Sequence, residues 1–178
     1  AMVLRHAAPQ SEIYVLATDV SPASIATAER GKYGTNSLRE PIPPRLASAY
    51  LHPTTDGGVE VSQEIRSLIE FRQVNLVNSD DLATVPGEFD FIFCRNVLIY
   101  FTPEHNRDVL SMMRNRLSDG GYLVLSALDQ REKVPGLELQ VPHGVPVLKR
   151  VDPPRPSASP QPSRRENSQL RDLPALPT

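Results

Sequence analysis

The sequence predicts an α/β protein with a mostly parallel sheet and a small β-hairpin insertion, on three observations. Apolar runs of strand length alternate with segments that carry helix signals. One of these runs, residues 13–19, is nearly continuous in apolar residues, which is typical of a strand buried on both faces of a parallel sheet, and residues 89–101 form the most apolar stretch of the chain. A turn sequence, Asp56-Gly57-Gly58, stands before the alternating residues 59–61 and predicts the hairpin.

The first part of the chain carries clear helix and strand signals. Residues 1–8 are typical of the end of a helix, which Pro9 closes, and residues 13–19 form the first predicted strand. Ser21 can cap a helix that has Pro22 at its first position and ends at Gly31. Residues 41–51 then predict a loop and a short helix before the hairpin, which we place as an insertion on the main sheet.

The second part repeats the alternation of strand and helix. Residues 68–76 and 89–94 predict two strands, and a loop with a helical turn follows the second. A helix begins with Thr102 as cap and Pro103 at its first position, and glycines 120 and 121 end it. Residues 122–128 predict the next buried strand, and two antiparallel strands flank residues 143–144. The buried face of the helix is predicted to comprise Val109, Leu110, Met113 and Leu117.

Composition narrows the class of protein. The 178 residues have a formal net charge of -2 and no apolar run near the roughly 20 residues that cross a bilayer, which argues against nucleic-acid binding and membrane insertion. A single cysteine, Cys94, excludes an internal disulfide framework, and the four histidines lack metal-ligand spacing, so we expect no metal site. We expect a cytoplasmic monomer with a folded domain over residues 1–150. Residues 151–178 are rich in proline and predict a disordered tail or linker, with a proline-rich docking motif as the alternative.

Polar side chains follow three of the predicted strands. Asp19 ends the first, Asn75 ends the second, and Arg95 and Asn96 follow the third. Because ligands of parallel α/β sheets bind beyond the carboxyl ends of the strands, these four residues are expected to line one crevice.

Each of these residues has a local alternative. The carboxylate of Asp19 can accept from both hydroxyls of a ribose or can cap the following helix. Asn75 suits the edge of an adenine, or it bonds its own turn. Arg95 can clamp a carboxylate at two points or form a surface ion pair. Tyr100 can place its hydroxyl over the crevice or belong to the core with its apolar neighbours. Cys94 is expected to be an inert buried thiol.

The segment FDFIFCRNVLIYF, residues 89–101, closely resembles the signature of the chemotaxis-receptor methyltransferases, the CheR family. ATDVSPASIATAERGKYG, DGGVEVSQEIRSLIEFRQVNLV and LSDGGYLVLS resemble further segments of that family in the same order, so the resemblance covers about residues 1–150. It implies a Rossmann-like methyltransferase fold with S-adenosylmethionine as cofactor. It further implies methyl transfer to glutamate side chains of chemoreceptors, which would be the partner.

The resemblance also implies roles for particular residues. Asp19 would hold the ribose, and Asn75 and Leu76 would border the adenine. Arg95 and Asn96 would face the methionine end of the cofactor, and Arg95 with Tyr100 would lie nearest the reacting centre.

The sequence departs from the family pattern in two ways, because some segments of the family are missing and one turn is altered. The first strand and glycine-rich loop of the family, and its helical N-terminal domain, would precede residue 1, and ALDQ stands where the family has a small-polar-acid turn. We therefore expect an incomplete fragment with little activity on its own. The alternative is a non-catalytic methyltransferase-like module for protein interaction or nucleotide sensing.

Overall fold

The computed structural model describes residues 1–34, 37, 41–126, 129 and 133–151. The chain divides into two compact units, Ala1–Gly87 and Glu88–Thr178, and each is described by itself. The predicted tail, residues 151–178, lies outside the described residues apart from Val151. Among the described helices, none is both long enough and apolar enough to span a membrane.

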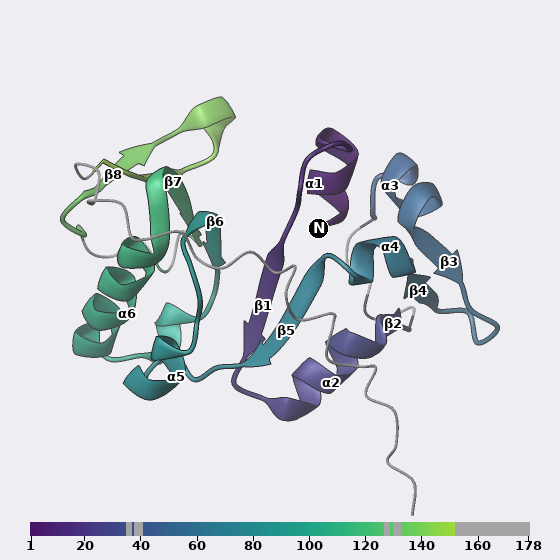
Figure 1. Cartoon of the computed structure of the whole chain (residues 1–178), viewed down its shortest axis with the longest axis horizontal. Coiled ribbons are helices and arrows are strands. Elements are labelled where there is room, and N and C mark those ends of the chain that lie inside the picture. Colours follow the sequence, from purple (N-terminus) through teal and green to yellow (C-terminus); the bar gives the residue numbers. More distant parts are fainter. Residues whose placement is uncertain (35–36, 38–40, 127–128, 130–132, 152–178) are drawn as a thin grey trace, which may run out of the picture. The chain divides into compact units, whose positions relative to one another are not determined.

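The first unit combines a two-stranded parallel sheet with a three-stranded antiparallel sheet (Figure 1). The parallel pair is β1–β5, and the antiparallel strands lie in the order β2–β4–β3. Its described elements are α1 (Met2–Ala7), β1 (Val15–Asp19), α2 (Pro22–Arg30), β2 (Lys32–Tyr33), α3 (Pro44–Tyr50), β3 (Leu51–Pro53), β4 (Val59–Val61), α4 (Gln63–Arg66), β5 (Ile69–Gln73) and α5 (Ser79–Ala83).

The parallel pair confirms the first two predicted strands, which run in register from Val15 beside Ile69 to Asp19 beside Gln73. The predicted burial of the first strand was wrong, because the side chains of β1 are half-buried or exposed. Within this unit β1 is hydrogen-bonded to β5 alone, and the packing onto the pair comes mainly from α2. A continuous apolar run therefore indicates a strand without guaranteeing that both faces are covered.

Helix α2 begins and ends at the predicted residues. The Ser21 side chain accepts a hydrogen bond from the Ser24 N–H at 3.3 Å, and Pro22 stands at the first position. Gly31 ends the helix in the left-handed conformation at φ 64°, which glycine adopts without steric cost. This end of the helix leads directly into β2, which the sequence did not predict.

The predicted hairpin is confirmed, and β2 extends it to three strands. In the antiparallel registers, Leu51 lies opposite Val61, and Lys32 lies opposite Glu60. The predicted short helix is α3, which packs against α1. The buried residues of this part form a small cluster, Leu46, Tyr50 and Ile65.

The second unit is a four-stranded sheet with one parallel pair, β6–β7, followed by two antiparallel strands in the order β7–β9–β8. The predicted strand at residues 89–94, the helical turn after it and the two closing strands are confirmed. The described elements are β6 (Phe89–Cys94), η2 (Leu98–Tyr100), α6 (Pro103–Arg116), β7 (Leu117–Leu125), β8 (Leu137–Gln140), η3 (Pro142–Gly144) and β9 (Val147–Arg150).

Helix α6 confirms the predicted cap and most of the predicted buried face. Val109, Leu110 and Met113 are buried on it. Leu117 is buried as predicted but not on the helix, because it is the first residue of β7 and lies opposite Phe89. The pairing shifts register between Phe89 and Phe91, and such an irregularity lets a strand absorb the glycines that were predicted to end the helix. The α/β class is confirmed.

Candidate functional site

Asp19 and Asn75 lie at the same carboxyl end of the parallel pair β1–β5, where Figure 1 shows both arrowheads together. Asp19 pairs with Gln73, and the N–H of Val74 donates to the carbonyl of Asp19 at 3.0 Å. Asn75 is the next residue. The structure therefore brings together the two residues that were predicted to bind an adenosine.

The Asp19 side chain is exposed and has one of its oxygens in a local bond. Oδ1 accepts from the N–H of Ser21 at 2.8 Å. The cap of α2 is therefore formed by Ser21, and Asp19 closes the turn that leads into it. Oδ2 makes no hydrogen bond within the described residues.

Asn75 is half-buried, and its backbone and side chain are both fixed. Its N–H donates to Oδ2 of Asp81 at 2.9 Å, and its Oδ1 accepts from the N–H of Val77 at 3.2 Å. The turn alternative is therefore realised too. The Nδ2 group makes no hydrogen bond with a described residue, and its two N–H donors suit the ring-nitrogen acceptors of adenine. Leu76, also half-buried, follows directly.

Gln73 and Asp81 stabilise this end of the strands, and neither was predicted from the sequence. Nε2 of Gln73 donates to the carbonyl of Val20 at 3.1 Å, which holds the loop after β1. Asp81 holds Asn75 from α5. The signal for α5 was available, because Asn78 before Asp80 and Asp81 is a cap followed by acids, and Asn78 Oδ1 accepts from the Asp80 N–H at 2.9 Å.

The predicted residues of the second unit follow β6. Arg95 is exposed and forms no ion pair with a described residue, so the surface ion pair is not seen. Asn96 has φ 60°, an uncommon conformation for a residue with a side chain. Tyr100 is 80% exposed in η2, so the core alternative for it is wrong. The two units are described separately, and the crevice that joins Asp19 and Asn75 to Arg95 and Asn96 stays a prediction.

Asp129 is a buried carboxylate that sequence reasoning did not single out. Its Oδ2 accepts from the N–H of Asn96 at 2.7 Å and from the Oγ and N–H of Ser126 at 2.5 and 3.3 Å. Desolvation acts to raise the pKa of Asp129. Hydrogen bonds from Ser126 and from the backbones of Asn96, Ser126 and Ile99 outweigh desolvation and hold the pKa below its ordinary value. A serine three residues before an acid, as in a capping box, was the available signal.

Cys94 is buried, and burial together with the nearby charge of Asp129 raises the pKa of its thiol to about 12. It is a thiol at neutral pH, in agreement with the inert role expected for it. Among the described residues, no three His, Cys, Asp or Glu side chains are placed to share a metal ion.

Parallel strands with polar residues at their carboxyl ends are typical of α/β domains that bind a ligand at that edge. Within that class, the chain belongs to the family described as CheR methyltransferase, SAM binding domain, whose model matches residues 1–142. S-adenosylmethionine is therefore the cofactor of the domain family to which the chain belongs.

Curated relatives are named chemotaxis protein methyltransferases. The chain is 37% identical over 123 residues to chemotaxis protein methyltransferase 1 of Pseudomonas aeruginosa, covering 69% of this chain and 44% of the relative. It is 37% identical over 115 residues to the chemotaxis protein methyltransferase of Vibrio parahaemolyticus, covering 65% and 41%. The chain thus spans less than half the length of these relatives. A solved structure of an O-methyltransferase family protein from Burkholderia thailandensis aligns with 84% of this chain and 46% of that chain, with TM-score 0.48 and 12% identity.

The first unit offers groups that fit the adenosine half of this cofactor. A ribose hydroxyl needs an acceptor, and Oδ2 of Asp19 supplies one at an exposed position. An adenine needs donors and acceptors at its edge, and Nδ2 of Asn75 supplies donors at the same end of the strands. The chemistry of this donor set agrees with the family.

Proposed function

We propose that residues 1–150 are part of a cytoplasmic enzyme that methylates glutamate side chains of chemoreceptors. The observation that supports the proposal best is the shared strand end of Asp19 and Asn75, in a chain of the CheR family. The names of the relatives, chemotaxis protein methyltransferases, support chemoreceptors as the class of target.

In this proposal the first unit binds the adenosine. Asp19 accepts from a ribose hydroxyl through Oδ2, the oxygen that is not bonded to the Ser21 N–H. Asn75 donates to the adenine edge through Nδ2, while Leu76 lies against the ring. Because Asp81 and the turn at Val77 already hold Asn75, little conformational freedom is lost when the ligand binds.

For the second unit we propose roles in the methyl-transfer step for Arg95, Asn96 and Tyr100. When bound, S-adenosylmethionine supplies a methyl group on a sulfonium, which is already a good leaving group. A glutamate carboxylate is ionised at neutral pH, so the residues need to align and desolvate it more than to move protons. Arg95 attracts a carboxylate by its charge, and Asn96 and the Tyr100 hydroxyl orient the reacting groups.

The test uses two proteins. One is the 178-residue chain, and the other is a fusion protein in which the part of the Pseudomonas aeruginosa relative that precedes its matched segment is joined in front of Ala1. Both are titrated calorimetrically with S-adenosylhomocysteine, and both are incubated with methyl-labelled S-adenosylmethionine and a chemoreceptor cytoplasmic fragment. A glutamate methyl ester releases its label as methanol in mild alkali, which identifies the product chemically.

We expect the fusion protein to bind S-adenosylhomocysteine and to transfer alkali-labile label, and the chain alone to bind weakly. A folded fusion protein that binds without transferring label would favour a nucleotide-sensing module. A folded fusion protein that does not bind at all would overturn the proposal.

A further inference from the structure

One side chain in the second unit links the segment after β6 to the segment after β7. Asp129 is 6% exposed, and its Oδ2 receives the Asn96 N–H from one segment and two donors of Ser126 from the other. The Asn96 bond joins residues that are 33 apart in sequence. Such a bond restricts the two segments relative to each other within this unit.

The conformation of Asn96 shows why this restraint matters. Its φ of 60° lies in the left-handed region, which costs free energy for a residue with a side chain and persists where the surroundings hold it. Arg95 and Asn96 are both exposed, so packing does little to fix their backbone. The N–H of Asn96 donates to a carboxylate at 2.7 Å, and charge-assisted bonds of this kind are among the stronger hydrogen bonds.

We propose that Asp129 is a positioning residue that holds the turn after β6, and with it Arg95 and Asn96, in one conformation. The consequence for cofactor binding rests on the proposed function, in which these two residues face the methionine end. The positioning itself does not depend on that function, because the hydrogen bonds belong to the chain without a ligand.

The chain offers a matched set of variants. Asp129→Ala removes the acceptor. Asp129→Asn removes the charge and keeps an acceptor. Because Oδ1 is buried without a hydrogen bond to a described residue, the new amide nitrogen can take its place without breaking one. Asp108→Asn is the control, since Asp108 is an exposed acid on α6 in the same unit.

The experiment measures amide hydrogen exchange by NMR on the 178-residue chain. In Asp129→Ala we expect the exchange of the Asn96 amide to accelerate by about 10- to 100-fold, with a smaller acceleration in Asp129→Asn. The amide of Leu123 in the buried part of β7 and the Asp108→Asn variant are expected to match the wild type. A general loss of stability would accelerate Leu123 as well, which separates positioning from a merely structural role.

Two results would overturn the positioning role. One is an Asn96 amide that exchanges at the unprotected rate in the wild type. The other is Asn96 protection that survives in both Asp129 variants. If Asp129→Ala does not fold, Asp129→Asn provides the test. Its Asn96 amide should exchange faster than in the wild type, and the chemical shift of the amide proton should move upfield because the carboxylate is lost. Titration of the wild-type fusion protein with S-adenosylhomocysteine tests the proposed function separately. If that protein does not bind the ligand, the exchange result for Asn96 still applies.

Discussion

Oδ1 of Asp19 accepts the N–H of Ser21 at 2.8 Å, so the acid expected to bind a ribose also closes the turn into α2. The two roles use different oxygens of one carboxylate. They can therefore be separated by a substitution that removes a single acceptor.

Asp19→Asn in the fusion protein is expected to weaken S-adenosylhomocysteine binding by about 10- to 100-fold, the loss typical of one hydrogen bond to a charged group. The remaining amide oxygen can still accept from Ser21, and the side chain is exposed, so the urea midpoint is expected to stay the same. Calorimetry and urea unfolding measure the two effects. Asp80→Asn, an exposed acid in the first turn of α5, is the control and should bind normally. Unchanged affinity in Asp19→Asn would remove Asp19 from the ribose site.

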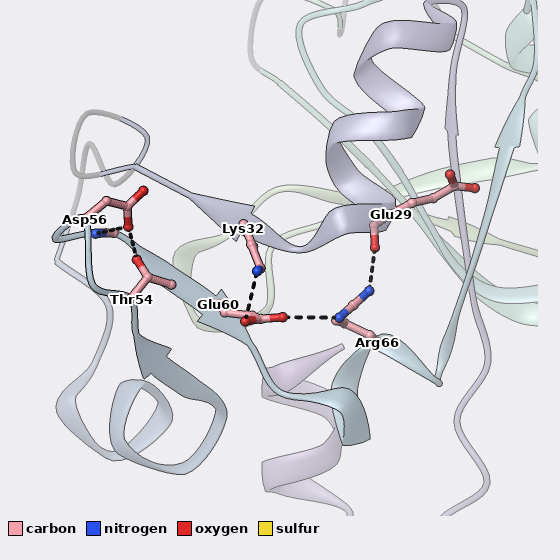
Figure 2. Close-up of polar contacts among 7 residues, drawn as sticks. Glu29, Lys32, Thr54, Asp56, Glu60 and Arg66 are labelled. Atoms are coloured by element: carbon pink, nitrogen blue, oxygen red, sulfur yellow. Dashed lines mark hydrogen bonds and ion pairs between the residues drawn. The ribbon is translucent and has the colours of Figure 1, made fainter.

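Arg66 ties the three-stranded sheet to the end of α2, as Figure 2 shows. Its Nη2 donates to the carbonyl of Glu29 at 2.9 Å, and its Nη1 lies 3.5 Å from Oε1 of Glu60. Its side chain also fills the space beside Gly31, where an added Cβ would stand 2.9 Å from Cδ of Arg66. One side chain thus satisfies a helix-end carbonyl and a strand acid together.

We expect Arg66→Ala to lower the free energy of unfolding by about 1–3 kcal/mol, because the helix-end carbonyl of Glu29 loses its Arg66 donor and the partly buried Glu60 carboxylate loses one of its two cationic partners. Lys32→Ala is the matched control, since the Lys32 side chain is 62% exposed and lies 3.7 Å from the other oxygen of Glu60. Its expected effect is below about 0.5 kcal/mol, as for other exposed pairs. Urea unfolding followed by circular dichroism measures both. Equal effects in the two variants would contradict this account of Arg66.

The sequence predicted best where the signal is local. The cap at Ser21, the end of α2 at Gly31 and the start of α6 at Pro103 each depend on a few neighbouring residues, and all three are confirmed. β2 was missed because Lys32 and Tyr33 form a strand only through pairing with β4, which lies far along the chain. Leu117 kept the helical spacing, yet its pairing with β6 takes it into a strand.

The same difference between local signals and distant contacts applies to the residues of the candidate site. Residues at strand ends could be found, because an apolar run marks the strand and the next polar residue marks its edge. For Asp129 the spacing to Ser126 signals only the local bonds, since the bond to Asn96 depends on a partner 33 residues away. The alternatives for Asp19 and Asn75 could not be chosen between, because each residue has enough polar atoms for a local bond and for a ligand.

The raised pKa of Cys94 predicts that the stability of the folded chain falls as the pH rises. Burial, and then the charge of Asp129, raise the pKa of the thiol to about 12 in the folded chain, against about 8.5 when unfolded. Its contribution is therefore fully present below about pH 8.5 and is lost as the pH rises toward the folded pKa, because the unfolded thiol ionises first.

Relative to Cys94→Ala, the wild type should lose about 2 kcal/mol of stability between pH 7 and 10. This is the free energy of ionising the unfolded thiol at about 1.5 pH units above its pKa, while the folded thiol stays protonated. Urea unfolding of both proteins at several pH values gives the difference, which cancels the titration of other groups. The chain has one cysteine, so a disulfide reagent reports on this thiol alone. Rapid labelling of the folded wild type at pH 8, at the rate seen in urea, would refute the raised pKa.

The charge of Arg95 and the hydroxyl of Tyr100 can each be tested for a role in methyl transfer. Both side chains are exposed, so substitutions there are not expected to unfold the protein. Arg95→Gln in the fusion protein should slow methyl transfer by about tenfold or more, since a charged partner of a carboxylate is lost. Arg95→Lys keeps the charge without the two-point geometry and should fall between Arg95→Gln and the wild type. Tyr100→Phe should slow transfer while leaving S-adenosylhomocysteine affinity unchanged, because the hydroxyl is assigned to the reacting centre. Initial rates of alkali-labile methylation measure all three. Wild-type rates in Arg95→Gln would show that this guanidinium takes no part in the reaction.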